Sequence, residues 1–160
     1  MIARPSSGPH SNGYSLIRKI LAVHYYKLQP SGELTDALLA PTNIYVKPIL
    51  KLLAEKINVK GMAHITGGGI TGNLTRCFPK GTAAVVDTKS WKLPAVFDWL
   101  QKQGNVEQEE MRRVFNCGVG FVVIVPRLSA AKTIASLKKS KLKPWILGEV
   151  VKGNQDVRYA

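Results

Sequence analysis

The sequence GVGFVVIV, residues 118–125, gives the strongest strand signal in the chain. It is rich in valine, isoleucine and phenylalanine, which favour strands, and a proline ends it. Asn116 and Cys117 lead into it, and its two glycines, Gly118 and Gly120, allow close approach of another backbone segment. A strand that is apolar throughout is buried on both faces, so we expect helices to cover its sheet.

Shorter apolar runs and helical periodicities flank this strand on both sides. The runs predict three further strands, over residues 59–65, 83–86 and 145–151. Apolar spacing predicts helices from Ser11, from Asn105, and over residues 34–40, 42–56, 73–78, 94–101 and 129–139. We expect residues 1–10 to form a loop and residues 152–160 a frayed tail. The predicted fold class is α/β (α+β), a mixed β-sheet covered by helices.

The composition limits the classes of protein to which the chain can belong. Hydrophobic residues make up 45% of the 160 residues, which is enough for a core. No apolar run approaches the roughly 20 residues of a membrane helix. The N-terminal residues lack the apolar region of a signal peptide. We therefore expect a cytoplasmic protein in which Cys77 and Cys117 are free thiols, Cys117 as a small buried residue.

The net charge of +13, from 23 basic and 10 acidic residues, raises the question of a nucleic-acid partner. The excess is spread along the chain. Its one dense cluster, KKSKLK at residues 138–143, lies at the expected end of a helix, where cations suit the helix dipole. No aromatic residues interleave with this cluster to stack on bases. A solvated basic face is the favoured interpretation, and we do not expect a nucleic-acid partner or a membrane partner.

Two glycine-containing loops carry most of the chemistry that the sequence suggests. HITGGGITGN, residues 64–73, places three glycines between an apolar run and a short helix, a pattern whose backbone N–H groups can surround a phosphate. SGPHSNGYS, residues 7–15, combines an imidazole, hydroxyls and an amide in front of a helix, a set that can hold a phosphate or a sugar. Each loop alone is explained equally well as a turn or a capped loop. One histidine in each loop favours a shared anion site.

Six segments, taken in order, resemble one enzyme family. They are SGPHSNGYSLIRKIL, LLAPTNIYVKPIL, VKGMAHITGGGI, SWKLPAVFDWLQ, GNVEQEEMRRVFNCGVGFVVIVP and WILGEVV. They are similar to successive blocks of aminoimidazole ribonucleotide synthetase, also called phosphoribosylformylglycinamidine cyclo-ligase. The resemblance is to the C-terminal domain of that enzyme. It predicts the domain over residues 7–152, a leader outside the family at residues 1–6 and a tail at residues 153–160.

The resemblance implies an ATP-dependent ligase of de novo purine biosynthesis. In that reaction ATP activates the amide oxygen of formylglycinamidine ribonucleotide, and an internal nitrogen then closes the imidazole ring. The products are aminoimidazole ribonucleotide, ADP and phosphate, and Mg2+ is implied as the partner of ATP. The full-length family has two domains and forms homodimers. In the family the N-terminal domain supplies much of the ATP site and the acidic metal ligands. We expect this chain to be a fragment, a split-gene product that works with a separate N-terminal domain, or a degraded copy.

Two positions depart from the family pattern. Gly72 stands where the family usually has glutamate, and Asn43 stands where arginine is common. A lost charged hydrogen bond costs about 1.5–3 kcal/mol, so both departures are expected to weaken binding. Three functions remain open at this point: an enzyme domain with an N-terminal partner, a binding or assembly module that has lost catalysis, and a basic nucleic-acid binder.

We expect the two loops to face each other and to form one polar pocket, for the substrate's ribose phosphate or for the phosphates of ATP. His10 and His64 are the candidate catalytic residues, because histidine is the usual proton-transfer group near neutral pH. The sequence holds no P-loop, dinucleotide fingerprint or zinc spacing, and we expect no metal site on this chain. The expected lining residues are His10, Ser11, Asn12, Gly13, His64, Thr66, Gly67, Gly68 and Gly69.

Overall fold

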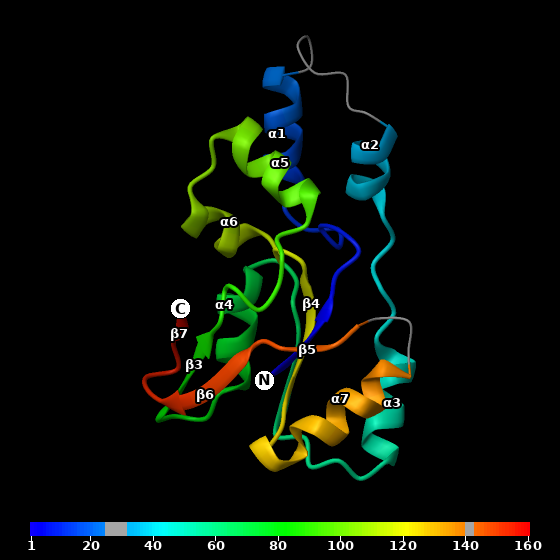
Figure 1. Cartoon of the computed structure of the whole chain (residues 1–160). Helices are drawn as coiled ribbons and strands as arrows, with labels where there is room; N and C mark the ends of the chain where they lie inside the picture. Colours follow the sequence, from blue (N-terminus) through cyan, green and yellow to red (C-terminus); the bar gives the residue numbers. More distant parts are fainter. Residues whose placement is uncertain (25–31, 140–142) are drawn as a thin grey trace.

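Two β-sheets form the centre of the structure, and helices surround them (Figure 1). The computed structural model describes residues 1–24, 32–139 and 143–160. The strands are β1 (Ile2–Pro5), β2 (Gly61–His64), β3 (Thr82–Val86), β4 (Val119–Ile124), β5 (Trp145–Ile146), β6 (Gly148–Lys152) and β7 (Val157–Tyr159). The helices are α1 (Tyr14–His24), α2 (Gly32–Leu39), α3 (Val46–Ala54), α4 (Gly69–Leu74), α5 (Ala95–Gly104), α6 (Gln108–Val114) and α7 (Ala130–Lys138), with 3-10 turns at Thr75–Cys77 and Arg127–Ser129.

The larger sheet has the strand order β2-β4-β1-β5, and each neighbouring pair in it is antiparallel. β4 is the apolar strand predicted over residues 118–125. β1 and β2 flank it, and because both run antiparallel to β4, they point in the same direction. Arg4 of β1 and His64 of β2 both lie opposite Phe121. The loops that follow β1 and β2 therefore leave the sheet at the same end of β4.

The smaller sheet has the order β6-β3-β7, with β3 antiparallel to β6 and parallel to β7. A single segment, residues 145–152, supplies an edge strand to both sheets, because β5 pairs with β1 and β6 pairs with β3. The sequence predicts one strand there. The change of sheet falls at Gly148, where φ is +152° and an added Cβ would lie 2.0 Å from the carbonyl oxygen of Val85. Only glycine accommodates that contact.

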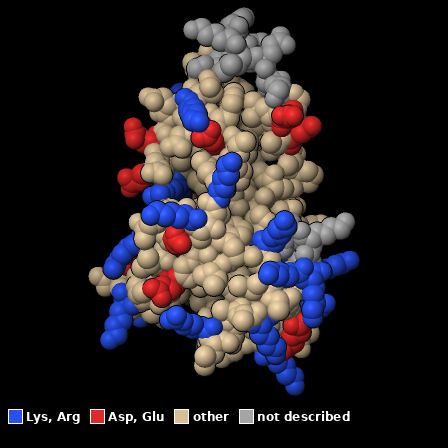
Figure 2. All heavy atoms as spheres, viewed as in Figure 1, with Lys and Arg blue, Asp and Glu red and all other residues tan. Residues whose placement is uncertain are grey.

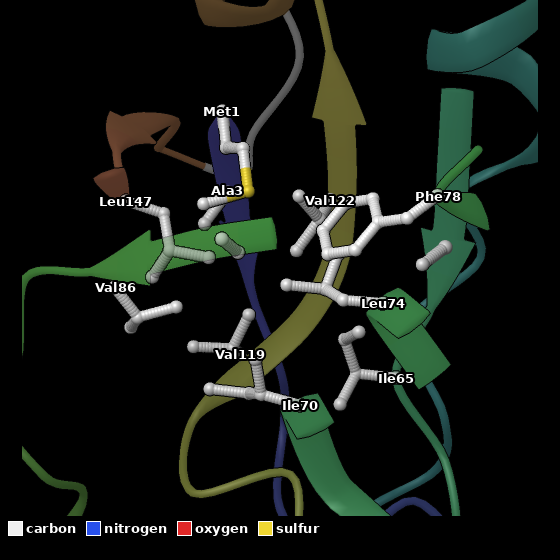
Figure 3. Packing of buried hydrophobic residues seen from close by; sticks show 12 residues of the cluster. Met1, Ala3, Ile65, Ile70, Leu74, Phe78, Val86, Val119, Val122 and Leu147 are labelled. Carbon is white, nitrogen blue, oxygen red and sulfur yellow. The ribbon is translucent and has the colours of Figure 1, made fainter. Parts of the chain in front are cut away.

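The larger sheet is covered on both faces. One face packs against α3 and α7 through Ile2, Ile49, Leu52, Val123 and Leu137. The other face packs against α4 and the smaller sheet through Ala3, Ile70, Leu74, Val86 and Val122 (Figure 3). A separate cluster joins α1, α2, α5 and α6 through Ile17, Leu38, Phe97, Leu100, Met111 and Phe115. The predicted arrangement of a mixed sheet covered by helices is confirmed, with the strands divided between two sheets.

Two secondary-structure predictions near the ends of the chain are wrong. Residues 2–5 form β1 and not a loop, and residues 157–159 form β7 and not a frayed tail. β1 is short and contains Arg4 and Pro5, two residue types that argue against an interior strand. β7 is only three residues long, and its pairing with β3 depends on residues far away in the sequence. Local patterns carry too little signal for either strand.

Some helix boundaries also differ from the predicted ones. The helix expected over residues 73–78 begins earlier, at Gly69, and continues as the 3-10 turn at Thr75–Cys77. Asn105 does not cap α6 but follows α5 with φ of 44°, and Glu107 precedes α6. Asparagine is favoured both before a helix and in left-handed backbone after one, so its type alone does not decide between the two positions.

Basic side chains are spaced over the face of the molecule shown in Figure 2, with acidic side chains between them. The predicted basic cluster at residues 138–143 lies partly outside the described residues, which omit 140–142. No helix in the described part of the chain has the length and apolar character needed to cross a membrane.

The core around α4 leads to a first prediction. Leu74 is fully buried in the cluster of Figure 3, whereas Leu128 is 99% exposed. We expect Leu74→Ala to lower the free energy of unfolding by about 2–5 kcal/mol, because it removes packed methyl groups and leaves a cavity. The matched change Leu128→Ala should alter it by less than about 0.5 kcal/mol. Urea unfolding of both variants measures this, and similar losses in both would contradict the described core.

Candidate functional site

The two predicted loops meet beyond the ends of β1 and β2. A Cβ placed on Gly67 would lie 3.2 Å from the side-chain oxygen of Asn12. The ring centroids of His10 and His64 are 6.2 Å apart, with an angle of 57° between the ring planes. The structure thus brings the HSNG loop (residues 7–15) and the glycine loop (residues 64–73) into contact. Their affinity for phosphate stays a prediction.

The nine predicted site residues differ in their access to solvent. Three are exposed: Ser11, His64 and Gly67. Four are half-buried: Asn12, Gly13, Thr66 and Gly68. Two are buried: His10 and Gly69. A ligand that approaches from solvent therefore meets the first two groups, and the two buried residues act through the shape of the loops.

His10 is only 3% exposed and holds the HSNG loop together. Its Nε2 accepts a hydrogen bond from the backbone N–H of Ser7 at 2.9 Å and lies 2.9 Å from the Ser7 hydroxyl. Acceptance at Nε2 places the proton of the neutral ring on Nδ1, which is buried without a hydrogen-bond partner among the described residues. Burial, with a smaller effect of His64, lowers the pKa of His10 from 6.5 to about 4. His10 is therefore neutral at pH 7.

His64 is the imidazole that solvent reaches. It lies on β2 opposite Phe121, and its ring packs at 6.1 Å from the Phe121 ring and 5.6 Å from the Tyr45 ring, between centroids. Partial burial lowers the pKa of His64 below its usual value of 6.5. At pH 7 the side chain is therefore mainly neutral, able to accept a proton at one nitrogen and to donate a hydrogen bond from the other.

Tyr45 is a site residue that the sequence analysis missed. It is 5% exposed, its hydroxyl donates a hydrogen bond to the carbonyl oxygen of Pro5 at 2.7 Å, and its ring lies 6.1 Å from that of His10. Burial raises the pKa of Tyr45 to about 12. Gly120 makes room for it, since a Cβ there would lie 1.9 Å from the tyrosine oxygen. The close approach expected at Gly120 is made by an aromatic side chain and not by another backbone segment.

Asn73 organises the glycine loop from inside. Its side-chain amide donates to the carbonyl oxygens of Gly67 at 3.2 Å and Gly69 at 2.8 Å. Gly68 and Gly69 have φ of +95° and +61°, in the left-handed region that favours glycine. A Cβ on Gly69 would also lie 1.8 Å from the carbonyl oxygen of Arg112 in α6. Backbone geometry and close packing thus explain why residues 68 and 69 are glycines, without any need for a ligand. Gly67 lies at the surface.

Asn116 anchors the HSNG loop to the start of β4. Its side-chain nitrogen donates to the carbonyl oxygen of Gly8 at 2.8 Å, and its side-chain oxygen accepts from the Ser6 hydroxyl at 2.8 Å. The neighbouring Cys117 is 6% exposed, and burial raises the pKa of its thiol to about 12. The thiol stays protonated at neutral pH, so the prediction of a small buried residue is confirmed for Cys117. The sequence places Asn116 at the entry to this strand, two residues before Gly118, and gives it no role of its own.

The family follows from the sequence of nearly the whole chain. Residues 2–160 match the family described as AIR synthase related protein, C-terminal domain. The chain belongs to this family. The identification as aminoimidazole ribonucleotide synthetase itself stays a prediction within it.

Solved structures share the fold of this AIR synthase related domain. Two are of E. coli HypE, one of them described as a hydrogenase maturation protein, with TM-scores of 0.59 and 0.62 and identities of 16% and 18%. A third is a HypE–HypF complex, with a TM-score of 0.60 and 16% identity. Each similarity covers 99% of this chain but only 46%, 46% and 48% of the other chain. The domain therefore spans about half the length of these proteins.

The donor set of the site does not fit magnesium. Mg2+ prefers carboxylate and water oxygens, whereas the two loops offer imidazoles, two side-chain amides, hydroxyls and backbone groups. In the ranges that the structure describes, no group of three or more His, Cys, Asp and Glu residues could hold a metal ion. We therefore derive no step through magnesium from the residues of this domain.

The buried, neutral His10 predicts a pH dependence of stability. Its pKa is about 4 in the folded protein and 6.5 in the unfolded chain, so the unfolded chain alone takes up this proton as the pH falls from 7 to 5. We expect the free energy of unfolding to fall by about 2 kcal/mol from this group over that interval. His10→Asn should lack this contribution, because asparagine does not titrate and tolerates the φ of +52° at this position.

Urea unfolding of both proteins at pH 7 and pH 5 measures the difference. The carboxylates and His64 are common to the two proteins, so their contributions cancel in the comparison. An equal change in the unfolding free energy of both proteins would contradict the lowered pKa of His10.

The glycine loop predicts opposite effects of two similar substitutions. Gly69→Ala should lower the free energy of unfolding by about 2–4 kcal/mol, because its Cβ meets the Arg112 carbonyl oxygen and φ is left-handed. Gly72→Ala should raise it by about 0.5–1 kcal/mol, because Gly72 lies inside α4 and nothing lies within 4 Å of an added Cβ. Thermal unfolding of the pair tests both, and a stable Gly69→Ala protein would refute the close packing against α6.

Proposed function

We propose that this chain is the substrate-binding half of an ATP-dependent ligase that closes the imidazole ring of formylglycinamidine ribonucleotide in purine synthesis. The contact between the HSNG loop and the glycine loop carries the proposal, because it joins two ligand-type loops from distant parts of the sequence. Membership of the AIR synthase related family supports the reaction class. The coverage of about half of each similar structure supports a second, N-terminal half. The role implies a cytoplasmic enzyme.

The accessible residues of the two loops have distinct roles in this proposal. Asn12, Thr66 and the backbone of Gly67 hold a phosphate group, of the substrate's ribose phosphate or of ATP, through neutral hydrogen bonds. The exposed ring of His64 donates a further hydrogen bond to the same group. In the reaction the amide oxygen takes the phosphoryl group of ATP, the internal nitrogen attacks the amide carbon, and the oxygen leaves with the phosphate. His64 is the better placed of the two histidines to accept the proton that the nitrogen loses, because solvent reaches it. His10 is a positioning residue.

The N-terminal half supplies what this domain lacks. The acidic ligands of Mg2+ and much of the ATP site belong to that half in the proposal, since the two loops do not fit the metal. The same half carries the homodimer interface implied by the resemblance. A complete active site then requires both halves, on one polypeptide or on two.

A second candidate is a binding or assembly module without catalysis. The structural observation that favours it concerns Asn43, where the resembling family commonly has arginine. Asn43 donates from its side chain to the carbonyl oxygen of Pro5 at 3.2 Å, so at this position the chain has a neutral scaffold contact and no cation. The similar structures include one described as a complex, HypE with HypF. In this alternative the domain keeps its partner contacts and has lost turnover.

The proposed function is tested by turnover of formylglycinamidine ribonucleotide with ATP and Mg2+. We expect no ring closure by the chain alone and ring closure after addition of an N-terminal domain from the family. Absence of turnover in both assays, with the chain shown to be folded by its circular dichroism, would overturn the ligase and favour the assembly module.

The phosphate-holding role of the loops has its own prediction. We expect His64→Ala to weaken the binding of inorganic phosphate about five- to tenfold, because it removes an accessible hydrogen-bond donor. The control is Lys80→Ala, which removes an exposed cation outside both loops. Titration followed by the amide signals of the glycine loop measures both. Equal affinity of His64→Ala and the unchanged protein would show that the loops do not hold phosphate through this residue.

A further inference from the structure

Two adjoining hollows lie on the side of the glycine loop that faces α6 and β7. One is a cavity of about 110 Å³ whose walls include the aromatic side chains of Trp91, Phe115 and Tyr159. The other is a wider groove of about 700 Å³, lined in part by residues 68, 71 and 72 of the glycine loop and α4. Arg112 and Tyr159 line both hollows, as does Gln108, so the two lie side by side. The proposed function uses neither.

Arg112 stands at the junction of the two hollows and forms no ion pair with the acidic residues that the structure describes. Its guanidinium carbon lies 4.1 Å from the centroid of the Tyr159 ring, a cation–π contact that fixes its position. The salt bridges found among the described residues do not include Arg112, whereas its neighbour Arg113 pairs with Glu110 at 2.6 Å. A half-buried guanidinium that no carboxylate neutralises is a ready site for an anion.

The other charges of the groove lie at its exposed rim. Glu107 and Glu109 line the groove near the start of α6, and both are exposed to solvent. Neither lies within 4.0 Å of Arg112 as an ion pair. Water screens these two carboxylates more than it screens Arg112, because Arg112 is half-buried. The inner end of the groove is therefore its positive end.

The cavity is suited to one small planar ring. Its volume of about 110 Å³ is somewhat below the roughly 150 Å³ of an apolar cavity that holds benzene. The indole ring of Trp91 is held in place at one side of the cavity, because its N–H donates a hydrogen bond to the carbonyl oxygen of Cys117 at 2.9 Å. The side-chain amides of Gln101 and Gln108 line the cavity, and neither amide has a hydrogen-bond partner in the part of the chain that the structure describes. They can bond the polar edge of a ring.

We propose that the cavity and the groove form one binding site for a small molecule that consists of a single planar ring and an anionic group such as phosphate. The ring occupies the cavity, where its edge meets the amides of Gln101 and Gln108. The anionic group meets Arg112 at the junction. The site shares residues 68, 71 and 72 with the glycine loop but includes neither His10 nor His64, so the inference does not rest on the proposed function.

Gly72 provides a sharp test of this site. It lines the groove, lies inside α4, and has nothing within 4 Å of an added Cβ. The Cβ of Gly72→Glu therefore meets no steric conflict, and the substitution adds a carboxylate to the lining of the groove that carries Arg112. Its negative charge opposes an anionic ligand, while the Arg112–Tyr159 contact is left in place. Gly72→Ala is the matched control, because it adds the Cβ without the charge.

The experiment is a titration of the full chain with phenyl phosphate, and separately with inorganic phosphate and with phenol, followed by backbone amide NMR signals. We expect phenyl phosphate to bind at least about tenfold more tightly than either of the other two compounds, because it engages both hollows. The shifts should centre on Trp91, Arg112 and Tyr159. Shifts that centre instead on the HSNG loop would overturn the site and place the ligand at the surface of the proposed function.

The variants complete the test. Arg112→Gln and Gly72→Glu should each lower the affinity for phenyl phosphate at least about tenfold. Gly72→Ala and Arg76→Gln, an exposed arginine outside the groove, should keep it within about twofold. Unfolding curves show whether each variant is folded. If Arg112→Gln does not fold, Gly72→Glu alone tests the loss of affinity. Equal affinities for phenyl phosphate and inorganic phosphate, or full affinity in Gly72→Glu, would overturn the proposal.

Discussion

The antiparallel pairing of β4 with both β1 and β2 is the constraint on which the rest of the structure depends. It makes β1 and β2 point the same way, so both candidate loops leave the sheet at one end of β4. It also sets Arg4 and His64 opposite the same residue, Phe121. The contact between Asn12 and Gly67 follows from this register, because no interaction local to either loop would bring them together. The candidate site is therefore a product of sheet topology.

Glycines, which have no side chain, matter at this end of the sheet as much as the larger residues do. Gly120 leaves room for Tyr45, Gly69 lies against α6, and Gly13 lies where a Cβ would be 2.2 Å from the ring of Phe115. These contacts explain why glycines gather here even before a ligand is considered. The surface left for a ligand is correspondingly narrow, with Ser11, His64 and Gly67 as its exposed members.

The sequence alone predicts the features that depend on local residue patterns or on the resemblance to a known family. It predicts β4, the fold class, the meeting of the two loops and the buried state of Cys117. It does not predict β1, because Arg4 and Pro5 obscure a strand whose stability comes from partners more than 100 residues away. Asn73 and Tyr45 were missed for a related reason. Their roles arise from hydrogen bonds and packing that only the tertiary structure creates.

The position of β1 has a consequence for the order in which the chain folds. This strand lies in the interior of the larger sheet, between β4 and β5, so Ile2 is paired with both Val123 and Ile146. Such contacts have very high sequence separation, and closing long loops before the contacts form slows folding. The helices and the pairing of β3 with β6 involve shorter separations. During synthesis the larger sheet stays incomplete until β5, its last strand in the sequence, can pair with β1, its first.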